Sequence, residues 1–329
     1  MKTVVRQLAA KVGWSLPLPR VFSVRRPVVL TYHGIPSHGL AGEVDAASFE
    51  RQMLFLKNHF DLVSWERLAT ARTRWSRVQV LLTFDDGFRN NAEVAAPILK
   101  RHGIPAVFFV CSRHAKPGEY LWFSYLRALE QWFSGNAFVF RGQLFDMSPS
   151  RRAFSVSLLR SELLNLRPHP QAMYEAIKEE CPQLEDFAPS SGLADRSAGM
   201  SAEQVKELSS DPLFTIGIHT VDHPYLTKCE PTEMIRQIED NKRWIEQITS
   251  RNCDLIAYPV GDHCGEVLRI CQKLDLRYGF TVEKSVEGDA KLQLCRVGIY
   301  RPSLDELGVK VRWSHLLTLL QSHGYLVSN

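Results

Sequence analysis

Two kinds of apolar pattern alternate along the chain. Short continuous runs such as Val28-Val29-Leu30-Thr31-Tyr32 are typical of strands buried on both faces, whereas segments such as 47–58 carry apolar residues on one helical face. From residue 27 onward this alternation indicates βα units around a mostly parallel sheet. It predicts strands at 28–32, 78–84, 104–110, 213–218, 255–258, 278–282 and 294–300, and helices at 47–58, 90–101, 201–209, 232–248, 265–274 and 304–322.

The alternation is interrupted between residues 112 and 199. This stretch predicts an aromatic helix at 121–133, a hairpin at 138–145 and two polar helices with proline-rich joints. Because about seven strands remain outside it, a barrel-like number, we interpret residues 27–329 as one barrel domain with an insertion at 112–199. Residues 1–26 are predicted to form a basic leader helix, since a lysine interrupts the apolar run that a signal peptide would need.

Composition narrows the functional classes only a little. The 329 residues are 45% hydrophobic and 23% charged, as in a soluble globular protein, and the net charge of +4 is scattered, which does not indicate nucleic-acid binding. No apolar run approaches the roughly 18 residues of a membrane span. Seven cysteines without a CxxC pair favour reduced thiols and a cytoplasmic location, and the oligomeric state is left open.

Polar residues follow two of the predicted strands. Asp85 and Asp86 come at the end of an apolar strand and precede a glycine, which is where α/β barrels keep their active sites. One carboxylate could bind a metal while the other faces the water on that metal, although a pair of aspartates capping the next helix is an equally ordinary arrangement.

His219 and His223 are the second such group, four residues apart after the apolar strand at 213–218. At this spacing the two imidazoles can reach one ion, whereas a single histidine is more often a satisfied core or surface residue. Together with Asp86 they form a set of two histidines and one carboxylate with open positions for water and substrate. An iron(II) oxygenase uses the same ligand types, but normally on an antiparallel β fold, and Asp85 would then have no role.

At these positions the chain resembles the polysaccharide deacetylases, carbohydrate esterase family 4, which share the NodB-homology fold. Thr83-Phe84-Asp85-Asp86-Gly87, the His-Thr-x-x-His of 219–223 and Ala257-Tyr258-Pro259-Val260-Gly261 are similar, in order and separation, to the first three motifs of that family. The resemblance covers about residues 27 to 301. It implies an α/β fold, a distorted (β/α)7 barrel of the glycoside hydrolase and deacetylase type, with a helical insertion.

The resemblance also implies a chemistry. A divalent metal, most commonly zinc, would be held by Asp86, His219 and His223, and the enzyme would hydrolyse the N-acetyl group of an amino sugar in a glycan or glycan precursor. Asp85 would be the general base, and the backbone N–H of Val260 would stabilise the oxyanion.

Two departures from the family motifs leave roles to be filled. No Leu-x-x-His pattern follows the strand at 294–300, so His33 is the candidate general acid, as in the exopolysaccharide-type subgroup that this chain resembles; the alternative is a histidine hydrogen-bonded to the strand end. Ala257 replaces the usual arginine of the third motif. Arg296 is the candidate to pair with Asp85 instead, and a salt bridge at the rim is its alternative.

Four further residues are candidates for contact with the substrate, but they do not identify it. Two rival functions also fit the residues: a hydrolase of the same fold acting on a small amide, and a glycan-binding relative without catalysis. Trp122 could stack on a sugar, but its helical spacing also fits a buried aromatic stripe. The candidates are Tyr32, Tyr258, Pro259 and Trp122.

Overall fold

Seven parallel strands close into a barrel in the computed structural model, which describes residues 27–40, 42–70, 77–282, 288–312 and 314. The ring closes because β1 pairs in parallel with both β10 and β3. This confirms the predicted distorted (β/α)7 barrel. In spatial order the strands are β1 (Val28–Tyr32), β10 (Leu294–Gly298), β9 (Tyr278–Thr281), β8 (Leu255–Ala257), β7 (Phe214–Ile218), β4 (Ala106–Val110) and β3 (Gln79–Phe84), and β2 (Asp61–Leu62) pairs with β3 from outside the ring.

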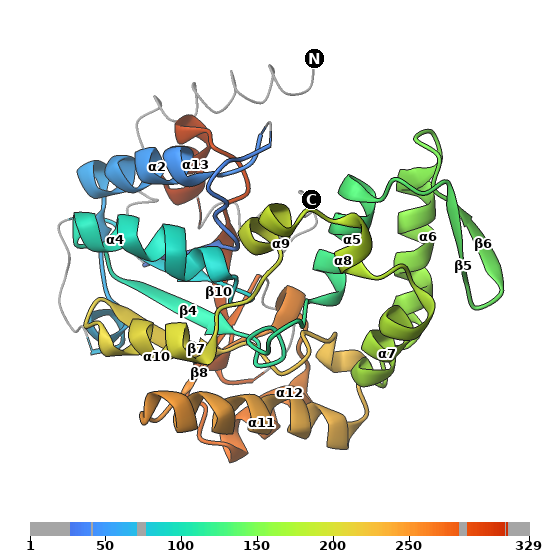
Figure 1. Ribbon diagram of the computed structural model, residues 1–329. Helices are drawn as coiled ribbons and strands as arrows, with labels where there is room; N and C mark the ends of the chain where they lie inside the picture. The colour runs from blue at the N-terminus through green and yellow to red at the C-terminus, as the bar shows by residue number, and fades with distance from the viewer. Residues whose placement is uncertain (1–26, 41, 71–76, 283–287, 313, 315–329) are drawn as a thin grey trace.

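Helices cover the outside of this barrel (Figure 1). The predicted helices are confirmed within a few residues, except that the segment at 90–101 contains a π-helical turn, Asn91–Ala95, ahead of α4. The predicted leader at 1–26 and residues 315–322 of the last predicted helix lie outside the described residues. The helices are α2 (Ala46–His59), α3 (Trp65–Thr70), α4 (Ala96–His102), α10 (Ala202–Ser210), α11 (Pro231–Thr249), α12 (Gly265–Lys273) and α13 (Leu304–Arg312), with 3-10 turns at Leu226–Lys228, Pro259–Gly261 and Ala290–Leu292.

The strand residues divide between two hydrophobic clusters because successive side chains point to opposite faces of a strand. One cluster lies between strands and helices and includes Leu30, Leu82 and Phe108. The other fills the barrel interior and includes Phe109 and Phe280. No helix in the described part of the chain is long and apolar enough to cross a membrane.

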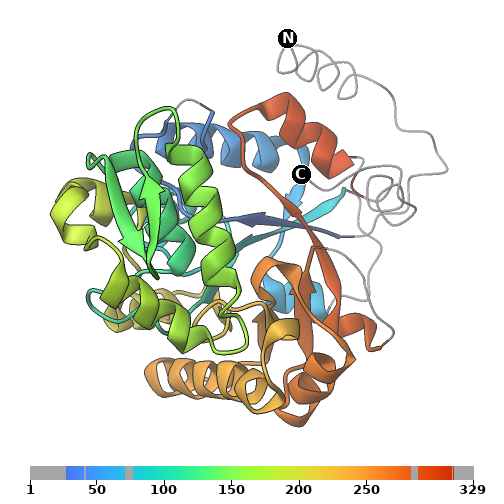
Figure 2. The same ribbon diagram turned by 90° about the vertical axis from the view of Figure 1, so that its right-hand side faces the viewer.

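The insertion, residues 112–199, lies between β4 and α10 and forms a layer on one side of the barrel (Figures 1 and 2). Its apolar side chains form a hydrophobic cluster separate from those of the barrel. Where two polar helices were predicted after the hairpin, the structure has four. The elements are α5 (Trp122–Trp132), β5 (Ala137–Phe140), β6 (Gln143–Asp146), α6 (Arg152–Leu164), α7 (Pro170–Glu180), α8 (Leu184–Phe187) and α9 (Ser190–Arg196). The division of the chain into leader, barrel domain and insertion stays a prediction.

Candidate active site

The turn after β3 places two buried carboxylates at the carboxyl end of the barrel. Asp85 and Asp86 are 4% and 1% exposed. Asp86 and Gly87 both have φ of 74°, and a Cβ atom on Gly87 would lie 2.8 Å from the Val110 side chain, so glycine lets the turn pack against β4. Both carboxylates face side chains from other strands, which favours a site over the helix-capping alternative.

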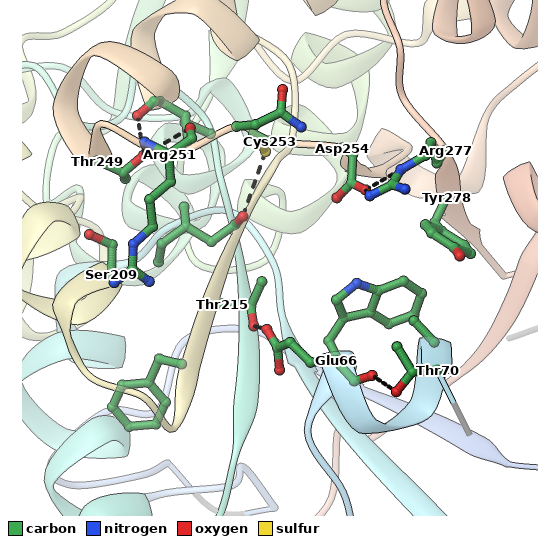
Figure 3. Close-up of a pocket in the computed structure, with 16 residues that line it drawn as sticks. Glu66, Thr70, Ser209, Thr215, Thr249, Arg251, Cys253, Asp254, Arg277 and Tyr278 are labelled. Atoms are coloured by element: carbon green, nitrogen blue, oxygen red, sulfur yellow. Dashed lines mark hydrogen bonds and ion pairs between the residues drawn. The ribbon is translucent and has the colours of Figure 1, made fainter. Parts of the chain in front are cut away.

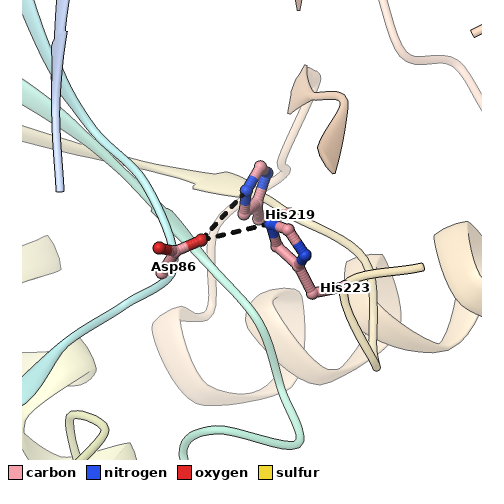
Figure 4. A group of neighbouring side chains, drawn as sticks. All are labelled: Asp86, His219 and His223. Carbon is pink, nitrogen blue, oxygen red and sulfur yellow. Dashed lines mark ion pairs between the residues drawn. The ribbon is translucent and has the colours of Figure 1, made fainter. Parts of the chain in front are cut away.

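Asp86 points toward the two histidines that follow β7 (Figure 4). Its Oδ1 atom lies 3.4 Å from Nε2 of His219 and 3.3 Å from Nε2 of His223. The three potential ligand atoms lie within 4.8 Å of one another, and all three side chains are buried. Burial alone would raise the pKa of Asp86, but its contacts with the two histidines hold that pKa well below its usual value.

The donor atoms of this cluster fit a divalent metal ion. Nδ1 of His219 lies 2.7 Å from the carbonyl oxygen of Ala257, which can only accept a hydrogen bond, so the free electron pair of the neutral ring is on Nε2, facing Asp86. Oδ1 of Asp86 has no hydrogen-bond partner among the described residues. Two imidazole nitrogens and one carboxylate oxygen are a ligand set of catalytic zinc sites.

Asp85 is paired with Arg296, as the sequence led us to expect. Two parallel hydrogen bonds of 2.6 and 2.7 Å join the guanidinium to the carboxylate, and Nη1 also reaches the hydroxyl of Thr83. Arg296 is only 5% exposed, so the pair lies inside the barrel and not at its rim. Burial raises the pKa of Asp85, but the charge and hydrogen bonds of Arg296, together with the nearby His219 and His33, outweigh burial and keep that pKa below its usual value.

His33 follows β1 and lies in the same cleft. It is close enough to Asp85 and Asp86 to act electrostatically on both carboxylates. Its Nδ1 atom is buried without a hydrogen-bond partner among the described residues, and its ring lies 5.6 Å from the ring of Tyr300. The predicted role of His33 as the general acid stays a prediction.

Val260 lies in the 3-10 turn that follows β8, with its backbone in the left-handed region, φ 50°, which is strained for a β-branched residue. Its side chain is 50% exposed and lines the cleft. The oxyanion role predicted for its N–H is not tested by this geometry.

The predicted substrate-contact residues are more deeply buried than expected. Tyr32 and Tyr258 are 0% exposed, and their hydroxyls already donate hydrogen bonds to Gln52 and to the carbonyl of Leu292. Pro259 is also buried. Trp122 is 3% exposed, in agreement with the core alternative for it. Substrate contact by these four residues stays a prediction.

A cleft of about 1860 Å³ opens above the site, between the strand ends and the insertion. Trp122, Phe123 and Arg160 line it from the insertion, and Tyr300 lines it from the segment after β10. Sequence reasoning missed Tyr300, which is 58% exposed. Its position just beyond the strand that carries Arg296 could have indicated it.

A second cavity, of about 380 Å³, lies at the opposite ends of the strands (Figure 3). Two pairs of its polar groups bond each other: Arg277 with Asp254 at 2.6 Å, and Thr215 with Glu66 at 2.8 Å. No described group there is arranged for chemistry comparable to that of the carboxyl-end cleft.

Comparison with known families agrees with this geometry. The family model described as polysaccharide deacetylase matches residues 74–130 and 187–279. The gap between the two matched segments lies inside the insertion. YxkH of Bacillus subtilis (strain 168), which carries a provisional polysaccharide deacetylase name, is 21% identical over 259 residues. That match covers 78% of this chain and 64% of YxkH, so the chain spans less than two thirds of this relative.

Solved structures show the same fold. The Streptococcus pyogenes deacetylase PplD in complex with acetate is 20% identical, with a TM-score of 0.55 over 85% of this chain and 96% of that one. IcaB from Ammonifex degensii is 18% identical, with a TM-score of 0.55 over 87% of this chain and 96% of that one. Identities this low support the barrel fold and leave the substrate open.

Proposed function

Because the chain belongs to the polysaccharide deacetylase family, we propose that it is a metal-dependent hydrolase that removes N-acetyl groups from an amino sugar in a polysaccharide or glycan precursor. The observation that carries this proposal is the buried cluster of Asp86, His219 and His223 beside the ion pair of Asp85 and Arg296. A metal site and an ionised base at the same strand ends suit amide hydrolysis by water.

The metal would be held by Asp86, His219 and His223, and zinc suits their nitrogen and oxygen donors. When bound, such an ion lowers the pKa of a coordinated water and polarises an amide carbonyl. Asp85 would accept the proton of the attacking water, because Arg296 keeps its carboxylate ionised.

His33 and Val260 would complete the reaction. The backbone N–H of Val260 would stabilise the negative charge that develops on the carbonyl oxygen, and His33 would protonate the departing amine, so that acetate and a free amino sugar leave. The position of His33 in the cleft that both carboxylates line supports this assignment.

We also propose that the protein works in a reducing compartment, the cytoplasm. Five of the seven cysteines are free thiols buried inside the protein. A glycan precursor would then be the accessible substrate. Cell fractionation tests this, and recovery of the protein only outside the cytoplasm would contradict it.

The function is tested by measuring bound metal together with acetate release from a panel of N-acetylated oligosaccharides and sugar precursors. We expect one metal ion per chain and acetate from at least one glycan. The Asp85→Asn variant should keep its metal and lose acetate release, because it removes the base and keeps the shape. Metal without acetate from any glycan would favour the small-amide hydrolase, and a protein that binds no metal would favour a glycan-binding role.

A further inference from the structure

The loop that carries the two candidate metal-binding histidines, residues 219–223, has a strained backbone. Thr220 and His223 have φ of 68° and 52°, in the left-handed region that side chains disfavour, and threonine is β-branched. Such conformations persist only where the surroundings hold them in place. The hydrogen bonds that reach this loop from outside therefore decide where its histidines lie.

The side chain of Asp222 anchors the loop to α11 and to the start of the insertion. It is 0% exposed, and its carboxylate accepts hydrogen bonds from Nε of Arg113 at 2.5 Å, Nε2 of Gln237 at 2.5 Å and Nη2 of Arg236 at 2.7 Å. Gln237 and Arg236 belong to α11. Three donors on one buried carboxylate fix its position.

The insertion anchors the backbone of the same loop. The hydroxyl of Tyr174, on α7, donates a hydrogen bond of 2.9 Å to the carbonyl oxygen of Asp222. Nε1 of Trp122, on α5, donates one of 3.3 Å to the carbonyl oxygen of His223. The guanidinium of Arg113 lies 4.3 Å from the centre of the Tyr174 ring, and it also bonds the side chain of Gln171.

We propose that the insertion is part of the metal site, and that Tyr174 and Trp122 are positioning residues that raise metal affinity by holding the loop at 219–223. Partners one step beyond metal ligands typically change metal affinity by about 10–100-fold when they are lost. Tyr174 lies in the part of the insertion that the family model does not match. The inference rests on the proposed metal site.

Tyr125 offers a matched control within the same hydrophobic cluster. Tyr125 and Tyr174 are 4% and 9% exposed, and each donates a hydrogen bond of 2.9 Å to a backbone carbonyl. Tyr125 binds the carbonyl of Pro182, which lies within the insertion. Tyr174 binds the carbonyl of Asp222, which lies in the loop at 219–223. Only the hydrogen bond of Tyr174 should therefore affect metal affinity.

The test is a titration of the metal-free full-length protein with Co²⁺, followed by its absorption spectrum. We expect Tyr174→Phe to weaken Co²⁺ binding about tenfold. Tyr125→Phe should bind as the wild type does, and the melting temperatures of the two metal-free variants should be similar. Trp122→Phe, which removes the second donor, should also weaken binding.

Equal Co²⁺ affinity of Tyr174→Phe and Tyr125→Phe, with Trp122→Phe at the wild-type value, would overturn the inference and leave the proposed function intact. A wild-type protein that binds no Co²⁺ would overturn the proposed metal site and the inference with it. If Tyr174→Phe does not fold, the comparison of Trp122→Phe with Tyr125→Phe decides in the same way.

Discussion

Asp85 and Arg296 come from β3 and β10, which both pair with β1, so their ion pair crosses the barrel interior above the end of β1. The sequence could place Arg296 on a strand and show that Ala257 stands where the third motif usually has an arginine. It could not show that β3 and β10 lie on either side of β1, because strand order in a closed ring depends on distant pairing. The structure shows that β3 and β10 both pair with β1.

Substitution of Arg296 should lower turnover more than metal content. Arg296→Met removes both charged hydrogen bonds to Asp85, each worth about 1.5–3 kcal/mol, and we expect kcat to fall at least tenfold. Arg296→Lys keeps the charge without the paired geometry and should retain more activity. Steady-state kinetics and metal analysis check this, with a melting curve to confirm folding; unchanged kcat in Arg296→Met would contradict it.

His33 should matter for chemistry and not for metal binding. We expect His33→Gln to lower kcat by about 10²–10⁴-fold, the usual contribution of a positioned proton donor, because glutamine cannot protonate the leaving amine. Metal content should stay at the wild-type value. The measurement is acetate release on the preferred substrate, and normal turnover would remove His33 from the mechanism.

At the scale of elements, the sequence predicted the barrel strands and long helices well, because each carries a complete apolar pattern. It missed β2 and α3, of two and six residues, because such short elements hold too few positions to establish a period. Short helices such as α8 were missed for the same reason. The site loops have no pattern at all: the left-handed backbone at Asp86, Thr220 and Val260 arises from tertiary contacts that spacing does not reveal.

Gly87 should be essential to the turn after β3. Gly87→Ala adds a methyl group 2.8 Å from the Val110 side chain, at a φ of 74°. The substitution should therefore lower the free energy of unfolding and weaken Co²⁺ binding. The matched control is Gly103→Ala, at a φ of 63° with nothing within 4 Å of the new methyl group, which should cost only about 1–2 kcal/mol of backbone strain. Urea unfolding and metal titration distinguish the two; equal effects would show that crowding at Val110 is unimportant.

At the scale of the whole molecule, the barrel and the insertion have separate hydrophobic clusters and meet at the cleft. The break in alternation predicts the insertion, but the sequence could not predict its contact with the loop at 219–223, because Tyr174 and Asp222 are 48 residues apart. The cleft likewise depends on how the two parts pack. The substrate of the cleft therefore cannot be predicted from the barrel or the insertion alone.

Metal binding should stabilise the whole fold. A ligand that binds only the folded state contributes about 2.7 kcal/mol when its concentration is 100 times its dissociation constant, so removal of metal by a chelator should lower the melting temperature and added Zn²⁺ should restore it. Asp86→Ala should melt at the same temperature with and without Zn²⁺. A zinc-dependent shift that persists in Asp86→Ala would place the metal elsewhere.

The two donors that reach the loop at 219–223 from the insertion also limit how this protein can be redesigned. Exchanging the insertion with that of a relative is an obvious way to alter one wall of the cleft and so the range of glycans accepted. Such a graft would also remove the phenol and indole that support the histidine loop. A successful chimera would have to carry equivalents of Tyr174 and Trp122, so specificity and metal retention would have to be engineered together.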